Sequence, residues 1–83
     1  MTTKNITLAE RKDGDRLVPL LVQTASRFKS SINLKKDEMT VNAKSIMGML
    51  NFGLIPGTTI ELSVSGEDEE EAMSTLEDFL TGK

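Results

Sequence analysis

The sequence predicts an α+β fold in which three helices cover one face of a four-stranded antiparallel sheet. Apolar and polar residues alternate with a period of two in four short segments, as expected for half-buried strands. Apolar residues recur at helical spacing in three other segments, so the predicted order is β-α-β-β-α-β-α. Because the strands alternate instead of being apolar throughout, one face of the sheet is expected to meet water.

A polar loop separates the first strand from the first helix. Ile6 and Leu8 alternate with polar neighbours and predict a strand over residues 3–8. Residues 10–15 are polar and include a glycine, which indicates a loop. The helix begins at Arg16, and its apolar stripe consists of Leu17, Leu20, Leu21, Ala25 and Phe28, widened by Val18 and Val22.

The start of this first helix also has the form of a weak anion site. Pro19 is tolerated there because its missing N–H lies in the first turn, and Asp13 or Asp15 is a candidate N-cap. A loop that meets a helix N-terminus can bind anions. The two aspartates oppose an anion here and only Arg16 favours one, so the segment carries little weight as an anion or nucleophile site.

Two further alternating segments predict a β-hairpin over residues 31–42. Ile32 and Leu34 mark its first strand, and Met39 and Val41 mark its second. The charged run Lys-Lys-Asp-Glu between the two pairs indicates a tight turn, although it contains no glycine.

The remainder of the chain predicts a short helix, a strand and a longer helix. Ser45 begins the short helix as its N-cap, and Gly53 is the expected left-handed stop. An alternating strand follows over residues 58–65. The acidic residues 68–71 lie in the first turn of the last helix, where they suit the helix dipole. The expected buried face of that helix is formed by Ala72, Met73, Leu76, Phe79 and Leu80.

The composition excludes several classes of function. The 83 residues allow one domain, expected to span residues 1–83, with one modest core. Cysteine and histidine are absent, which excludes disulfides, thiol chemistry, histidine-based catalysis and a phosphohistidine intermediate. The net charge of −3 gives no general affinity for nucleic acid or anionic membranes. With no apolar run near the ~20 residues of a membrane span and no signal peptide, we expect a cytoplasmic protein.

Ser45 has two interpretations. As a plain N-cap, its hydroxyl accepts an N–H of the first turn and stabilises the helix by about 1 kcal/mol, which is the simpler interpretation by itself. As a phosphoacceptor, it would hold a phosphate against free backbone N–H groups and place up to about two negative charges beside an apolar segment. The second interpretation supplies a switch that needs no refolding.

The segment after Ser45 has more apolar residues than a two-turn helix can bury. They are Ile46, Met47, Met49, Leu50 and Phe52. Core packing is expected for Ile46 or Met49 and for part of the rest. Methionine is common on adaptable binding surfaces, and we expect a partner-binding patch around Met47, Leu50 and Phe52.

The acidic run over residues 67–71 also has two interpretations. It resembles a site for a metal ion or a basic partner, but a solvated helix start matched to the dipole explains it more simply. An EF-hand is excluded because the ligand spacing and the central glycine are missing. We therefore expect no metal site and no cofactor.

Several segments carry a resemblance that covers nearly the whole chain. LLVQTASRF, INL, VNAKSIMGML and SGEDEEEAMSTLEDFL are similar to the HPr phosphocarrier family of the bacterial sugar phosphotransferase system (PTS). The predicted order of elements agrees with that family's open-faced β-sandwich. The segment around Ser45 is the most specific part of the resemblance.

The resemblance implies two phosphorylation sites. One is a histidine in a Gly-x-His-Ala-Arg-Pro motif at the start of the first helix, which carries phosphate from enzyme I to the sugar-specific enzymes IIA. The other is the serine of a Lys-Ser-Ile-Met-Gly motif, which an ATP-dependent HPr kinase/phosphorylase modifies. The serine-phosphorylated form is a corepressor for catabolite control protein A.

This chain keeps the serine motif and lacks the histidine. Residues 44–48 match the serine motif, with Ser45 as the acceptor. The histidine position holds Gly14, and the alanine, arginine and proline positions hold Asp15, Arg16 and Leu17. No other alignment restores the site because the sequence has no histidine. An acyl phosphate on Asp15 carries little weight, since Asp13 repels an incoming anion. The pattern is similar to that of the Crh-like members of the family, although the altered loop means that partners need not be shared.

The residues and the resemblance together predict a regulatory protein that is not an enzyme. HPr kinase is expected to phosphorylate Ser45, and a transcription factor of the catabolite control type is expected to bind the result. The expected contact residues are Arg16, Ile46, Met47, Leu50 and Phe52. The alternatives are a phosphocarrier, which the missing histidine opposes, and a scaffold that binds enzyme I or enzymes IIA without being modified.

Overall fold

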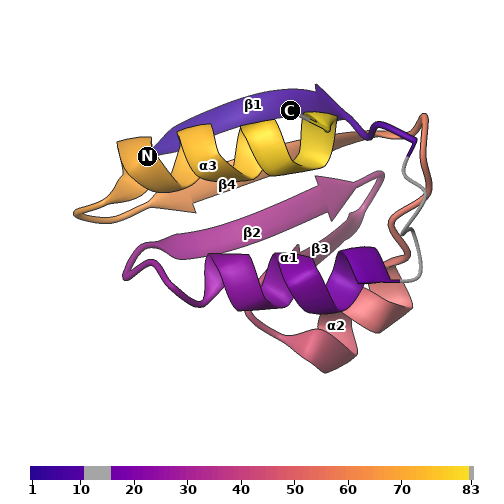
Figure 1. Ribbon diagram of the computed structural model, residues 1–83, viewed down its shortest axis with the longest axis horizontal. Helices are drawn as coiled ribbons and strands as arrows, with labels where there is room; N and C mark the ends of the chain where they lie inside the picture. The colour runs from indigo at the N-terminus through magenta and orange to yellow at the C-terminus, as the bar shows by residue number, and fades with distance from the viewer. Residues whose placement is uncertain (11–15, 83) are drawn as a thin grey trace.

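The computed structural model describes residues 1–10 and 16–82, and its elements follow the predicted order (Figure 1). The strands are β1 (Thr2–Thr7), β2 (Ser31–Lys36), β3 (Met39–Asn42) and β4 (Thr59–Ser65). The helices are α1 (Leu17–Ala25), α2 (Ile46–Phe52) and α3 (Glu69–Thr81). The predicted α+β class with three helices on a four-stranded antiparallel sheet is confirmed.

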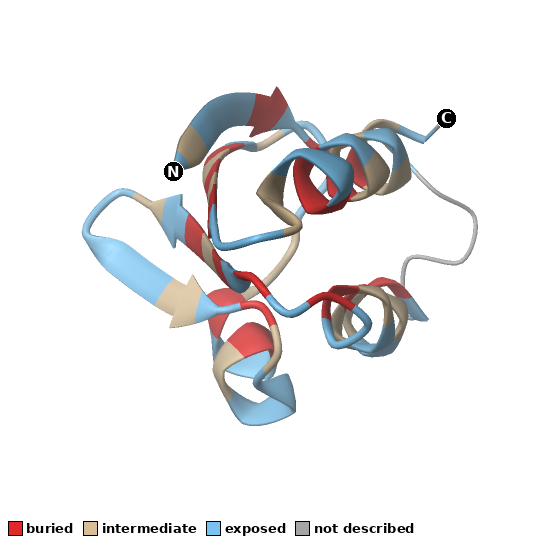
Figure 2. Ribbon diagram, turned by 90° about the vertical axis from the view of Figure 1, so that its left-hand side faces the viewer, coloured by how far each residue is buried: buried red, intermediate tan, exposed pale blue. Residues whose placement is uncertain are grey.

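The sheet has the strand order β1-β4-β2-β3, and every neighbouring pair is antiparallel. Its register aligns the apolar residues of one face, because Ile6 lies opposite Ile60 and Leu34 lies opposite Leu62. The helices α1 and α3 run side by side along that face, with α3 over β1 and β4 (Figures 1 and 2). The short helix α2 packs against α1 and β3, at one side of the sheet.

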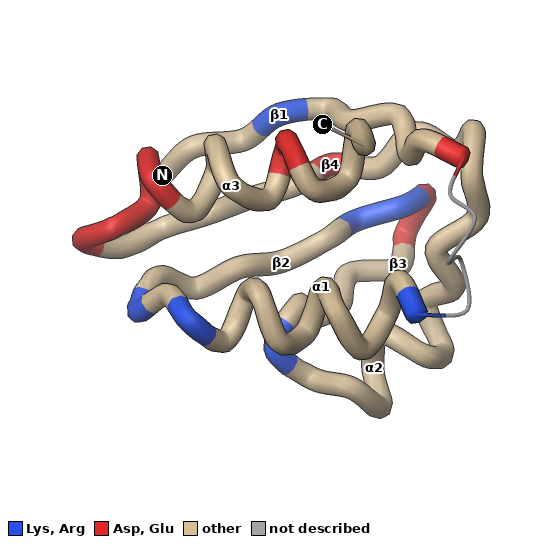
Figure 3. Tube along the Cα trace, viewed as in Figure 1, with Lys and Arg blue, Asp and Glu red and all other residues tan. Residues whose placement is uncertain are grey.

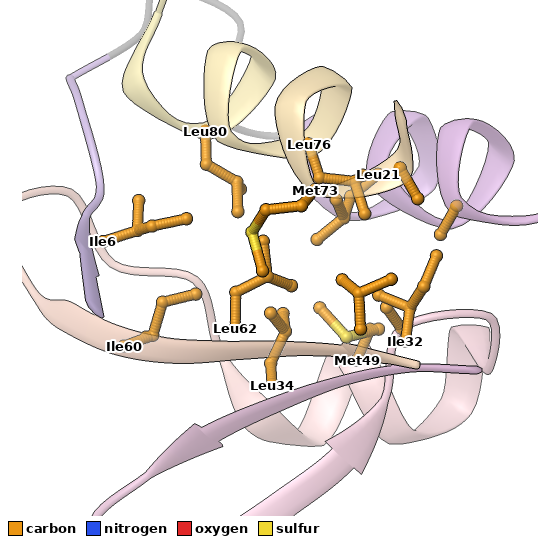
Figure 4. Close-up of a cluster of buried hydrophobic side chains, with 14 of the residues drawn as sticks. Ile6, Leu21, Ile32, Leu34, Met49, Ile60, Leu62, Met73, Leu76 and Leu80 are labelled. Atoms are coloured by element: carbon orange, nitrogen blue, oxygen red, sulfur yellow. The ribbon is translucent and has the colours of Figure 1, made fainter. Parts of the chain in front are cut away.

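The core lies between this face of the sheet and the helices (Figure 4). Its largest fully buried side chains include Leu21 of α1, Met49 of α2 and Leu76 of α3. The sheet contributes Ile6, Ile32, Leu34, Ile60, Leu62 and Val64. Burying one such aliphatic side chain stabilises the fold by roughly 1.5–3 kcal/mol relative to leaving it in water. Because the apolar residues alternate with a period of two, they all lie on one face of the sheet, and that face is the one that packs against the helices. Among the helices of the described residues, none has the length and apolar character needed to cross a membrane.

The ends of α1 differ from the prediction. The helix stops at Ala25, and Phe28 is buried in the turn that follows instead of on the helix. Its N-cap residue is Arg16, whose side chain makes no capping hydrogen bond. The candidate caps Asp13 and Asp15 lie outside the described residues.

Two smaller expectations also change. Met39, expected to alternate inward, is 46% exposed because β3 is an edge strand at the rim of the core. Gly53 ends α2 with a positive φ of 74°, as expected of a glycine stop, but its ψ of 107° lies outside the left-handed helical region.

Candidate functional site

Ser45 is the N-cap of α2, as predicted. Its backbone is extended, and its hydroxyl oxygen accepts a hydrogen bond from the N–H of Gly48 at 3.3 Å. Its carbonyl accepts the first helical hydrogen bond, from the N–H of Met49 at 3.0 Å. The residue is exposed, so the oxygen that caps the helix is also accessible from outside the protein.

The turn between β3 and α2 fixes the position of this hydroxyl. The side-chain oxygen of Asn42 accepts a hydrogen bond from the N–H of Lys44 at 2.8 Å. The backbone carbonyl of Asn42 accepts one from the N–H of Ser45 at 3.0 Å. The ammonium group of Lys44 donates to the carbonyl of Phe28 at 2.7 Å, which ties the turn to the segment after α1. The bond from Lys44 to Phe28 is a tertiary contact that the sequence pattern does not signal. The bonds of Asn42 are local to the turn, and an asparagine that accepts from an N–H two residues later is typical of turns.

The helix α2 divides its apolar residues between two faces. Met49 and Phe52 lie in the core, with 0% and 3% of their surfaces exposed. Ile46, Met47 and Leu50 are 41%, 72% and 60% exposed, and these three residues are named the apolar patch below. The outward side of α2 is correspondingly exposed in Figure 2.

The predicted place of Phe52 on the partner-binding surface is wrong. Its ring is buried, and the ammonium group of Lys36 lies 5.3 Å from the ring centroid, in the range of a cation–π contact. Met49 and Phe52 are three residues apart and share a helical face, whereas Met47 lies five positions before Phe52 and points elsewhere. Of the two candidates for core packing, Met49 is buried and Ile46 is not.

Arg16, the remaining residue expected to contact a partner, is exposed at the start of α1. The helix α1 packs against α2, so Arg16 and the apolar patch belong to neighbouring elements. Gly14 and Asp15, at the positions of the histidine motif, lie outside the described residues.

The acidic run before and within α3 is engaged in local structure. Asp68 accepts hydrogen bonds from the hydroxyl of Ser30 and the N–H of Lys29, and these bonds lower the pKa of its carboxyl group. Glu69 accepts from the N–H of Gly66 at 3.1 Å and the hydroxyl of Thr2 at 2.8 Å, which lowers its pKa in the same way. In the part of the chain that the structure describes, no group of three or more acidic side chains is placed to hold a metal ion.

The acidic side chains therefore gather away from α2, whereas Lys36 lies over its Phe52 ring and Lys44 directly precedes its N-cap. Figure 3 shows acidic residues gathered at the turn from β4 into α3, whereas α2 contains no charged residue. The site presents the Ser45 hydroxyl and, beside it, the apolar patch. Such a surface can accept a covalent modification and bind a partner.

Comparison with known proteins matches most of the chain to one family. A family model described as the PTS HPr component phosphorylation site matches residues 14–82. The phosphocarrier protein HPr of Neisseria meningitidis serogroup A is 48% identical over 60 residues, which are 72% of this chain and 67% of that protein. The HPr-like protein Crh of Halalkalibacterium halodurans is 48% identical over 65 residues, which are 78% of this chain and 77% of that protein.

The three-dimensional comparison agrees. The crystal structure of HPr-C-His from Thermoanaerobacter tengcongensis matches with a TM-score of 0.89 and 42% sequence identity, covering 96% of this chain and 91% of that chain. By identity, the chain is as similar to a phosphocarrier as to an HPr-like protein.

Proposed function

The chain belongs to the HPr family of the PTS, and within that family we propose that it is a regulatory member, phosphorylated on Ser45 by HPr kinase and then bound by a transcription factor of the catabolite control type. Proteins of this family are phosphocarriers or regulators in the cytoplasm, and they are not enzymes. Membership implies PTS partners such as HPr kinase or enzyme I.

The observation that carries the proposal is the exposed Ser45 hydroxyl at the N-cap of α2, directly before the apolar patch. A phosphate on this oxygen would meet the N–H groups of the first helical turn and the positive end of the helix dipole. The fold would therefore tolerate the modification. The patch would acquire a charged rim, and its choice of partner would change without refolding.

A partner would recognise the modified surface through both charged and apolar contacts. A partner's arginine can contribute roughly 1.5–3 kcal/mol through a charge-assisted hydrogen bond to the phosphate. Ile46, Met47 and Leu50 would supply the apolar area beside it, and Arg16 would offer its guanidinium to an acidic group of the same partner. Because Phe52 is buried, we do not include it among the contacts.

The absence of histidine argues against a phosphocarrier role. A carrier needs a group that accepts and releases a phosphoryl group readily, and the imidazole that performs this in the family has no counterpart in the sequence. Enzyme I with phosphoenolpyruvate should accordingly leave the chain unlabelled. An acid-labile phosphate on the chain would support the carrier role instead.

The direct test is incubation with HPr kinase and ATP, followed by mass spectrometry of the intact chain and of its peptides. We expect one phosphoryl group, located on Ser45 and absent from a Ser45→Ala variant. Binding of the transcription factor should then be compared between Ser45→Asp and Ser45→Asn, because both residues can cap the helix and only aspartate adds charge. Failure of the kinase to label Ser45 would remove the proposed switch.

A second candidate is a scaffold that binds PTS components without modification. It is favoured by the apolar patch, which is exposed before any phosphate is added. Unmodified protein should then capture enzyme I or an enzyme IIA, and Leu50→Ala should weaken the capture. If only the phosphorylated form binds a partner, the regulatory function is favoured over the scaffold.

A further inference from the structure

The methionines of this chain fall into two sets of very different exposure. Met1, Met39 and Met47 are 82%, 46% and 72% exposed, whereas Met49 and Met73 are 0% and 3% exposed. The sequence has no cysteine, histidine, tryptophan or tyrosine. The methionine thioethers are therefore the side chains of this protein that mild oxidants attack most readily.

Met47 differs from the other two exposed methionines in its surroundings. Met1 is at the N-terminus, with its amino group 3.1 Å from Glu69, and Met39 lies on the edge strand β3. Met47 lies in α2 between the two other members of the apolar patch, next to Ile46 and three residues before Leu50. A change at its sulfur atom therefore changes the character of the patch itself.

We propose that Met47 is an oxidation site whose conversion to the sulfoxide turns the apolar patch polar while the core stays intact. A hydroperoxide supplies the oxygen atom. The sulfur lone pair attacks one oxygen of hydrogen peroxide, and an S–O bond forms as the O–O bond breaks. The proton of the transferred oxygen passes, through solvent, to the departing hydroxide, which leaves as water. The sulfur is oxidised by two electrons and the peroxide is reduced. The step can be reversed by methionine sulfoxide reductases.

The burial of Met49 and Met73 makes this a local change. Their sulfur atoms are reached only when the protein opens, so their oxidation follows the small population of open molecules. Met47 needs no opening. The proposal that the change weakens partner binding rests on the proposed function, whereas the oxidation of Met47 and the loss of apolar surface do not.

The first experiment maps the order of oxidation. Folded protein is treated with millimolar hydrogen peroxide, and peptides are analysed by mass spectrometry over time. Met47 should gain one oxygen roughly tenfold or more faster than Met49 and Met73, with an unchanged far-UV circular dichroism spectrum. Oxidation of the buried pair in step with Met47 would overturn the proposal.

The second experiment measures how apolar the surface of the protein is before and after oxidation. On a hydrophobic-interaction column, the oxidised protein should elute earlier than the untreated protein. Met47→Leu keeps an apolar side chain of similar size that peroxide does not oxidise, so peroxide should shift its elution less than that of the matched Met39→Leu variant, which keeps Met47. An equal response of both variants would contradict the assignment to Met47.

The third experiment concerns the partner. Chain phosphorylated on Ser45 should bind the transcription factor about tenfold more weakly after peroxide treatment. The phosphorylated Met47→Leu variant should bind equally well before and after treatment, whatever its starting affinity. Unchanged affinity of the oxidised chain would overturn the regulatory half of the proposal. If the untreated phosphorylated chain does not bind, the proposed function fails, and the first two experiments still decide whether Met47 is the oxidation site.

Discussion

The carboxylate of Asp68 accepts hydrogen bonds from both the backbone N–H and the hydroxyl of Ser30, which lies 38 residues earlier in the chain. The same carboxylate accepts from the N–H of Lys29 at 2.9 Å. Three donors from the turn after α1 therefore meet one side chain at the start of α3. This contact joins the turn after α1 to the turn before α3. We therefore expect substitution of Asp68 to lower the stability of the fold.

Replacing Asp68 by asparagine should lower the free energy of unfolding, because the amide leaves one acceptor oxygen for these three donors and carries no charge. Urea denaturation at neutral pH measures the change. Glu70→Gln is the matched control, since Glu70 is an exposed acidic residue of the same helix turn. Equal effects of the two substitutions would contradict a specific role for Asp68.

The pH dependence of stability should follow from the same groups. Hydrogen bonds from Ser30 and Lys29 lower the pKa of Asp68 below 3.8, and those from Gly66 and Thr2 lower the pKa of Glu69 below 4.5. For an acid with a lowered folded-state pKa, the stabilisation is complete above the unfolded-state pKa and is lost as the pH falls through the folded-state value. The free energy of unfolding should therefore decline below about pH 4.5, and the decline should be shallower in Asp68→Asn. Parallel curves for the two proteins between pH 3 and pH 5 would count against this assignment.

Replacing either of two glycines by alanine should change the stability of the protein, in opposite directions. A Cβ atom on Gly66 would lie 2.6 Å from the hydroxyl oxygen and 2.7 Å from the Cα of Ser30, and the backbone there has a φ of 152°. We expect Gly66→Ala to cost about 1–3 kcal/mol. A Cβ on Gly48 would meet its nearest neighbour, the Ser45 hydroxyl, at 3.4 Å in a helix, so Gly48→Ala should stabilise by up to about 0.5–1 kcal/mol. Thermal unfolding of both variants tests the pair, and similar losses would contradict the geometry.

Substitutions on the buried face of α2 should lower stability, and substitutions on its exposed face should weaken partner binding. Phe52→Ala removes a buried ring and should cost about 3–5 kcal/mol. Leu50→Ala removes an exposed side chain and should change stability by less than about 0.5 kcal/mol while weakening whichever partner uses the apolar patch. Denaturation and binding assays on both variants provide the measurement. A large loss of stability in Leu50→Ala would show that the patch is part of the core.

The capping role of Ser45 can be measured apart from its modification. Ser45→Ala should destabilise the protein by about 1 kcal/mol because the N–H of Gly48 loses its acceptor. Ser45→Asn should restore most of this loss and remain unphosphorylated. Amide hydrogen exchange within α2 is the sharpest readout, and equal protection in the two variants would argue against the cap.

The fold was predictable because its signals are local and repeated. Ile60, Leu62 and Val64 alternate cleanly, and each is buried on the same face of β4. Ser45 was predictable as an N-cap because capping depends on residues within one helical turn. Such patterns require no knowledge of which segments meet in space.

The errors concern faces and distant contacts. The sequence prediction groups Phe52 with the exposed Met47 and Leu50, whereas its spacing of three residues from Met49 places it on the buried face of α2. The contact of Asp68 with Ser30 and that of Lys44 with the carbonyl of Phe28 could not be predicted, because they depend on how loops from separate elements are brought together.

The strand order has a consequence for how the chain acquires its structure. The segment 59–65 lies between β1 and β2, and Val64 is opposite both Thr2 and Ile32. Until that segment leaves the ribosome, the first strand has no partner strand, and the hairpin of β2 and β3 has only α2, itself packed on α1, to support it. Loop closure over some sixty residues must therefore precede the first stable nucleus that includes β1, and folding during synthesis must wait for the late central strand.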